Sequence, residues 1–200
     1  MKKFCITGGI ACGKSEVSRF LSLSGWEVID TDLIAREQLE PGSEGYKKVV
    51  DAFGNNILNE DHLVDRTLLG RVVFSDPEKR NLLNAILHPL IRSVWQHRLQ
   101  QHLRNFPEVP VVVVIPLLFE TRGEGEFDSV ACVATPIDIQ LERLRQRGMT
   151  DVEAGQRIRA QEPQGEKIKK SQVLLWNSGS LELLKRQTEL LKKVWLKRRG

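Results

Sequence analysis

The feature that most constrains the fold of this 200-residue chain is a glycine-rich octapeptide near its start. GGIACGKS, residues 8–15, follows the short apolar run FCIT and precedes a segment whose apolar residues have helical spacing. Glycines let successive backbone N–H groups turn toward one anion, and the N-terminus of the following helix adds partial positive charge. The pattern Gly-x4-Gly-Lys-Ser between a strand and a helix therefore predicts a phosphate-binding loop.

The loop also predicts which ligand binds. Lys14 can reach the β- and γ-phosphates of a nucleoside triphosphate, and the Ser15 hydroxyl can ligate Mg²⁺. We therefore expect a nucleoside triphosphate as co-substrate, Mg²⁺ as the metal ion and Lys14 as a catalytic residue. The loop residues expected to contact this nucleotide are Gly8, Gly9, Ala11, Cys12, Gly13, Lys14, Ser15 and Glu16.

Apolar runs that alternate with helical segments predict an α/β fold. The run VPVVVV is β-branched at consecutive positions, as in a parallel strand covered on both faces. No strand-like run occurs between Asp32 and Pro107, which indicates a helical insertion. The expected architecture is a P-loop NTPase-type parallel sheet sandwiched by helices, with a helical substrate-binding insertion and a helical lid. Strands are expected within residues 2–7, 26–30, 109–120, 127–135 and 171–177.

The same alternation divides the chain into three expected parts. The nucleotide-binding core comprises residues 1–32, 107–136 and 166–200, the helical acceptor domain residues 33–106, and the lid residues 137–165. Helix starts are marked by capping residues. Asp65 and Asp76 are expected N-caps, Pro77 suits a first helical position, and Thr150 forms a capping box with Glu153.

The net charge of +4 does not indicate a surface for nucleic acid. The last twenty residues carry +5, so the other 180 residues carry −1 and lack the broad cationic face that a duplex needs. Within that basic tail Leu184, Leu191 and Trp195 repeat at helical spacing, which favours packing onto the core. We expect no nucleic-acid partner.

The composition also argues against a membrane protein and a disulfide framework. The longest apolar stretch is interrupted by prolines and too short to span a bilayer, and the N-terminal apolar run stops before a signal peptide could form. The three cysteines include no CxxC pair, so neither disulfides nor a zinc site are indicated. A cytoplasmic location without a membrane partner is expected, and the sequence is silent on oligomeric state.

Two aspartates favour a kinase over a protein that hydrolyses the nucleotide. Asp30 and Asp32 fall at the carboxyl end of the second strand, the edge where open α/β sheets hold their ligands. A carboxylate there can take the proton of an acceptor hydroxyl, and Asp32 is the favoured candidate. The alternative, that an aspartate only caps a helix starting near Leu33, stays open, most of all for Asp30.

The helical insertion supplies a second feature, because an acceptor-binding subdomain would lie directly after Asp32. His88 and Arg92 are four residues apart and share a helix face. Arg36 and Arg66 lie in the same insertion. In the alternative interpretation, His88 only precedes a helix start at Pro89 and Arg92 is solvated.

Arginines late in the chain supply the third feature. Arg143 and Arg147 share one helix face, and Arg157 and Gln161 lie on the next helix. Arginine-rich helices over a phosphate site can close as a lid and neutralise the transferred charge. The alternative is an ordinary solvated face, with Arg147 paired to Asp151.

These segments together resemble the bacterial dephospho-coenzyme A kinases, almost from end to end. The resemblance rests on ITGGIACGKS, VIDTDLIAREQLEPG, DRTLLGRVVFSD, LNAILHPLIR, PLLFE, the stretch ending RIRAQ, and NSGS, in the order of that family. It implies transfer of the ATP γ-phosphoryl group to the ribose 3′-hydroxyl of dephospho-coenzyme A, the last step of coenzyme A synthesis. It further implies that Asp32 is the general base and also contacts the acceptor. The other implied acceptor contacts are Arg36, His88 and Arg92. Arg143 and Arg147 would be lid residues that bind ATP.

Three residues depart from the family pattern. Glu16 replaces the usual hydroxyl residue, and its carboxylate has to point away from a triphosphate. Cys12 replaces a serine. Because the backbone N–H at this position is expected to bind the phosphate, the replacement should have little effect. Trp176 stands where an aspartate is common. The alternatives are another small-molecule or nucleoside monophosphate P-loop kinase and, in a different class, a nucleic-acid-associated NTPase anchored by the basic tail.

Overall fold

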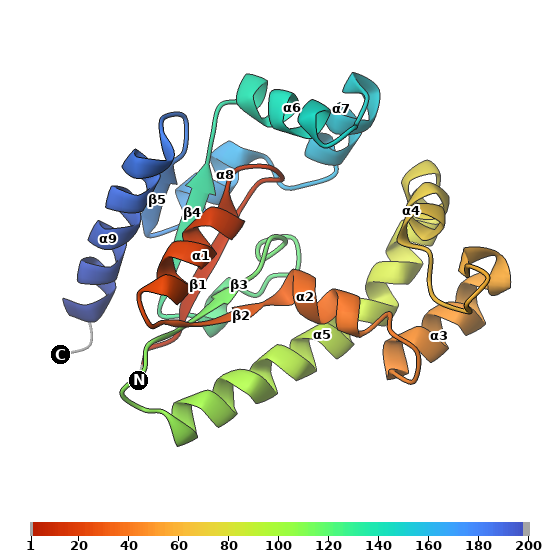
Figure 1. Cartoon of the computed structure of the whole chain (residues 1–200), viewed down its shortest axis with the longest axis horizontal. Helices are drawn as coiled ribbons and strands as arrows, with labels where there is room; N and C mark the ends of the chain where they lie inside the picture. The colour runs from red at the N-terminus through yellow and green to blue at the C-terminus, as the bar shows by residue number, and fades with distance from the viewer. Residues whose placement is uncertain (1, 198–200) are drawn as a thin grey trace. The chain divides into compact units, whose positions relative to one another are not determined.

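The computed structural model describes residues 2–197, apart from the side chains at positions 74 and 75, and contains a five-stranded sheet. All neighbouring strands are parallel, in the order β2-β3-β1-β4-β5 (Figure 1). The strands are β1 (Phe4–Gly8), β2 (Glu27–Asp30), β3 (Val111–Val114), β4 (Ser129–Ala134) and β5 (Val173–Trp176). β1, β3 and β4 are buried at every position, as expected of strands covered on both faces. The predicted parallel α/β fold is confirmed.

Two helices pack against one face of the sheet, α1 (Lys14–Leu23) and α9 (Leu181–Lys197) (Figure 1). The predicted docking of the tail helix is confirmed, because Leu184, Leu191 and Trp195 are all buried in the core. The indole of Trp195 stacks on Phe4 with 4.6 Å between ring centroids, and its N–H donates to the Ser129 hydroxyl. Arg198 and Arg199, part of the tail's positive charge, lie outside the described residues.

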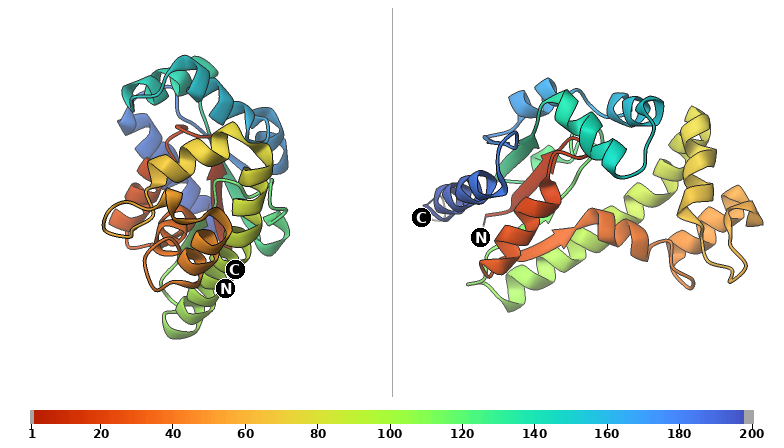
Figure 2. Two further views of the ribbon diagram at one scale, coloured as in Figure 1. Left: turned by 90° about the vertical axis from the view of Figure 1, so that its right-hand side faces the viewer. Right: turned by 45° about the horizontal axis from the view of Figure 1, so that its top comes forward.

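Three further helices follow β4 in the chain: α6 (Ile137–Gln146), α7 (Asp151–Arg159) and α8 (Gln164–Lys170) (Figure 2). The predicted capping box of Thr150 and Glu153 is present at the start of α7. Asp151 pairs with Arg145 rather than with Arg147, so the ion pair considered from the sequence is wrong. A short 3₁₀ helix, η2 (Glu124–Glu126), precedes β4.

A helical unit forms a second compact part of the chain, Thr31–Gln100. It contains α2 (Thr31–Glu37), α3 (Glu44–Phe53), η1 (Asn55–Ile57), α4 (Arg66–Ser75) and most of α5 (Pro77–Asn105). Its own core gathers the buried side chains of Val49, Ile57, Leu69, Val73 and Leu87. Within the described part of residues 33–106 no strand forms, and Leu58 and Val64 make one isolated bridge.

The capping residues of this unit act as predicted. The Asp65 carboxylate accepts from the Thr67 and Leu68 N–H groups at the start of α4, and Asp76 caps α5 ahead of Pro77. Two interpretations are corrected. α5 runs through Pro89 without ending, so no helix starts there. α2 begins at Thr31, which places Asp32 inside the first turn rather than at the cap of a helix near Leu33.

None of the helices in residues 2–197 is both long and apolar enough to cross a membrane.

Candidate active site

The phosphate loop joins the end of β1 to the start of α1. Gly8 and Gly13 have φ angles of 144° and 100°, values that only glycine adopts readily. A Cβ atom on Gly8 would lie 2.1 Å from the Val133 carbonyl oxygen, and one on Gly13 would lie 2.2 Å from Nδ2 of Asn177. Both glycines are therefore required by conformation and by close approach.

Lys14 folds back over the loop that precedes it. Its ammonium group donates to the carbonyl oxygens of Gly8 and Gly9, at 2.9 Å each. The positive charge is therefore held at the loop that is expected to receive the phosphates, at the N-terminus of α1.

Polar side chains from distant parts of the chain hold the loop from outside. Asn177 donates from Nδ2 to the Cys12 carbonyl at 2.8 Å. Arg143 donates to the Ala11 carbonyl at 3.0 Å and to the Asn177 carbonyl at 3.3 Å. The structure thus brings Arg143 to the loop, whereas Arg147 is exposed at the C-terminal end of α6.

The Cys12 side chain contributes more than the sequence indicated. It accepts a hydrogen bond from Nε2 of Gln140 and donates to Oε1 of Gln164. Burial raises the pKa of the Cys12 thiol above its ordinary value, and it raises that of Cys132 to about 12. The thiol beside the phosphate loop is therefore uncharged at neutral pH and adds no repulsion toward an anion.

Glu16 and Trp176, the two other departures from the family pattern, also make hydrogen bonds with side chains of this protein. Glu16 accepts two hydrogen bonds from Arg19, one turn further along α1, so its carboxylate is turned toward a cation. The backbone N–H and carbonyl of Trp176 are both bound by the side chain of Gln187, while the residue as a whole is 41% exposed. Why a tryptophan stands at position 176 has no structural explanation.

The acceptor-side candidates all belong to the helical unit. Asp32 and Arg36 are four residues apart on α2, and both are exposed. An ion pair between Glu37 and Arg98 joins the end of α2 to α5, the helix that carries His88 and Arg92. Asp30, in contrast, is the last residue of β2 and pairs in register with Val114.

His88 is half-buried, and this burial lowers the pKa of its imidazole below the ordinary 6.5. The ring is therefore neutral at neutral pH, so it can donate one hydrogen bond and accept another. Its expected contact with an acceptor is a hydrogen bond rather than a charge.

Sequence reasoning missed several residues around the loop. Asn177 lies in the NSGS segment, which contributed to the resemblance but was not assigned a role. Gln140 and Gln164 contact the loop or its supports, and isolated glutamines carry no periodic or motif signal. Gln161 was expected on the same helix as Arg157, but α7 ends at Arg159, and the Gln161 side chain contacts the loop instead.

Comparison with known proteins identifies the family. The family model described as dephospho-CoA kinase matches residues 4–182. The chain belongs to the dephospho-CoA kinase family. A dephospho-CoA kinase of Carboxydothermus hydrogenoformans is 43% identical over 191 residues, which cover 95% of this chain and 92% of that protein.

Two solved structures agree with this membership. A Thermus thermophilus protein has a TM-score of 0.77 and 36% identity, with 100% of this chain and 98% of that chain covered. A dephospho-CoA kinase from Campylobacter jejuni has a TM-score of 0.71 and 27% identity, with 99% and 98% covered. The predicted family and the P-loop kinase fold are confirmed, and the chain is a kinase.

Proposed function

We propose that this member of the dephospho-CoA kinase family transfers the γ-phosphoryl group of ATP to the ribose 3′-hydroxyl of dephospho-coenzyme A, which completes coenzyme A synthesis. The supporting observation is a fully formed phosphate loop between β1 and α1, with the Lys14 ammonium held at its carbonyls, in a chain of this family.

On the nucleotide side, the expected loop residues other than Ile10 bind the phosphates, and Lys14 follows the charge of the transferred group. The Ile10 N–H does not take part, because it donates to the Gln161 side chain. Glu16 takes part through its backbone, because its carboxylate is bound to Arg19. Arg143, already at the loop, binds ATP directly, and Arg147 joins it when the lid closes over the nucleotide.

The residues present fit a magnesium ion that is carried mainly by the nucleotide. Within residues 2–197, no group of three or more His, Cys, Asp or Glu side chains gathers to hold a metal. Mg²⁺ usually retains several water ligands and is bound by few protein oxygens together with the phosphates of the substrate. The exposed Ser15 hydroxyl at the start of α1 supplies one such oxygen. Ser15 would hold the ion, which would supply positive charge to offset the negative charge of the phosphates.

On the acceptor side, Asp32 takes the proton of the 3′-hydroxyl as its oxygen attacks the γ-phosphorus. The bond from phosphorus to the β–γ bridging oxygen breaks, and ADP leaves. Arg36 and Arg92 pair with the anionic groups of dephospho-coenzyme A, and the neutral His88 donates a hydrogen bond to it.

The proposed division of labour assigns residues 1–32, 107–136 and 166–200 to nucleotide binding, residues 33–106 to the acceptor and residues 137–165 to the lid. A cytoplasmic location and the absence of a nucleic-acid partner remain predictions.

A coupled assay of ADP release across acceptors tests the function. We expect turnover with dephospho-coenzyme A, a product phosphorylated at the 3′-position by ³¹P NMR, and no stimulation by nucleoside monophosphates or duplex DNA. Lys14→Ala should abolish turnover, while Lys47→Ala, an exposed lysine on α3, serves as the matched control. Faster turnover with another acceptor would overturn the assignment.

A further inference from the structure

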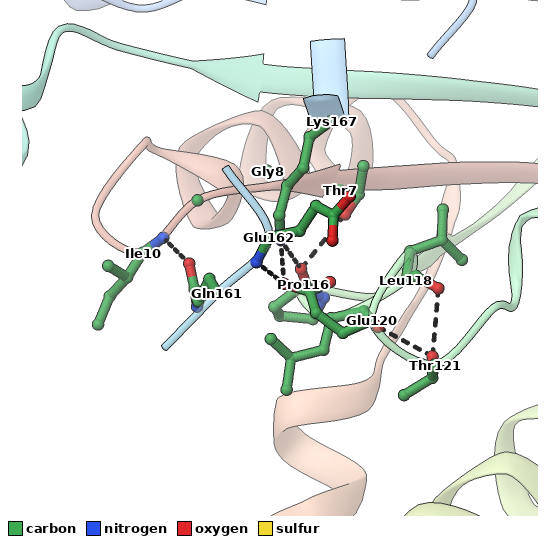
Figure 3. Close-up of polar contacts among 12 residues, drawn as sticks. Thr7, Gly8, Ile10, Pro116, Leu118, Glu120, Thr121, Gln161, Glu162 and Lys167 are labelled. Carbon is green, nitrogen blue, oxygen red and sulfur yellow. Dashed lines mark hydrogen bonds and ion pairs between the residues drawn. The ribbon is translucent and has the colours of Figure 1, made fainter. Parts of the chain in front are cut away.

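An ion pair between a fully buried lysine and a partly buried glutamate lies beneath the phosphate loop, on the face of the sheet opposite α1. Lys167 of α8 is 0% exposed, and its ammonium lies 2.7 Å from Oε1 of Glu120 and 2.9 Å from the Pro116 carbonyl (Figure 3). The Thr7 hydroxyl, one residue before the loop, donates to the same carbonyl at 3.3 Å. The Glu120 side chain is 18% exposed, so the lysine carries most of the burial. Removing charged groups from water is costly, and an apolar pair of similar size is often as stable. Stability alone therefore does not explain the pair.

The pair is connected to the loop through one short segment. The same Oε1 atom of Glu120 accepts a hydrogen bond from the backbone N–H of Glu162 at 2.9 Å. The preceding residue, Gln161, directs its side-chain carbonyl to the loop, where it accepts from the N–H of Ile10 at 2.8 Å (Figure 3). Contacts thus run without a break from Lys167 to Ile10.

The other end of this segment is held by a second amide side chain. Gln164 donates to the Thr135 carbonyl at 3.0 Å, accepts from the Thr135 N–H at 3.2 Å, and accepts from the Cys12 thiol. Residues 161–164 are therefore fixed at both ends, and each end touches the phosphate loop. Because Gln161 is uncharged, it binds the loop without repelling a triphosphate.

We propose that Gln161, held in place by the Glu120–Lys167 pair, is a positioning residue that keeps the phosphate loop in its binding conformation. Preorganised N–H groups bind developing charge without reorganisation, so a loop that loses this support binds ATP less well. The inference rests on the proposed function only in naming ATP as the nucleotide.

Two variants remove the support at different points. Gln161→Leu removes the acceptor for the Ile10 N–H, and the double variant Glu120→Leu/Lys167→Met replaces the ion pair with apolar side chains. Each should raise the Kd for ATP about three- to tenfold, the usual range for one lost hydrogen bond. KM for the acceptor should not change. Lys169→Met is the matched control, because Lys169 pairs with Glu166 on the same helix but is 72% exposed.

Amide exchange separates positioning from a general structural role. The Ile10 N–H should be protected in the wild-type protein without nucleotide and should lose this protection in Gln161→Leu. Gln161→Glu keeps an acceptor oxygen of the same reach, so protection should return, while its charge should still weaken ATP binding.

ATP binding and exchange are measured without acceptor, so these outcomes do not depend on which acceptor is phosphorylated. Wild-type ATP affinity in folded Gln161→Leu, or unchanged Ile10 protection, would overturn the inference. If the double variant does not fold, Gln161→Leu decides alone, because it leaves the ion pair intact.

Discussion

Gly13→Ala tests the close packing between the phosphate loop and Asn177. The new Cβ would lie 2.2 Å from Nδ2 and 3.3 Å from Cγ of Asn177, so that side chain has to move. The Asn177 amide would then lose its 2.8 Å hydrogen bond to the buried Cys12 carbonyl. The substitution also forces a residue with a Cβ into a φ angle of 100°.

The magnitude follows from these two costs. A non-glycine residue at positive φ costs about 1–2 kcal/mol. A buried carbonyl left without its donor costs about 1–3 kcal/mol. The free energy of unfolding of Gly13→Ala should therefore fall by about 2–5 kcal/mol.

Gly25→Ala is the matched control. Gly25 has a φ angle of 79°, and an added Cβ there would meet no atom within 4 Å, so only the conformational cost applies. Equilibrium urea unfolding without nucleotide measures both variants. If the free energy of unfolding falls no more in Gly13→Ala than in Gly25→Ala, the packing argument is refuted.

Three further predictions concern catalysis and pH. Asp32→Asn should lower kcat about 10²–10⁴-fold with ATP affinity nearly intact, whereas Asp30→Asn should lower kcat by a smaller factor. A larger loss of kcat in Asp30→Asn than in Asp32→Asn would mean that the base is misassigned. Arg143→Ala should weaken ATP binding, measured by calorimetry, more than Arg147→Ala, because only the former is hydrogen-bonded to the loop among the described residues. Burial lowers the pKa of His88, so the unfolded chain takes up a proton that the folded chain does not, and stability should fall as pH drops below 6.5. His88→Gln should flatten that dependence in urea titrations between about pH 7.5 and about pH 5.5. If the unfolding free energy of His88→Gln depends on pH as steeply as that of the wild-type protein, this prediction is contradicted.

The parts of the fold that the sequence predicted are those with local signals. The glycine pattern of residues 8–15 requires a particular backbone shape, and the four valines of β3 require cover on both faces. Caps such as Asp65 and Asp76 act within three residues of their own position. Each of these signals is contained in a short stretch of chain.

The parts that the sequence did not predict depend on tertiary packing. Pro89 favours a helix start, yet Leu87 and Ile91 on either side of it pack into the same cluster, and this burial holds one continuous helix. Gln140 and Gln161 reach the phosphate loop from more than a hundred residues away in the chain. No local pattern marks such a contact.

The stacking of Trp195 on Phe4 has a consequence for the order in which the protein is made. β1 leaves the ribosome first, but the aromatic cover of Phe4 and Trp26 comes from α9, which is translated near the end. Until then α1 alone covers this face, and the apolar surface that α9 will bury stays exposed, of the kind that chaperones and proteases recognise. A stop codon a few residues upstream of Trp195 should therefore yield a chain that is degraded rather than a weaker kinase.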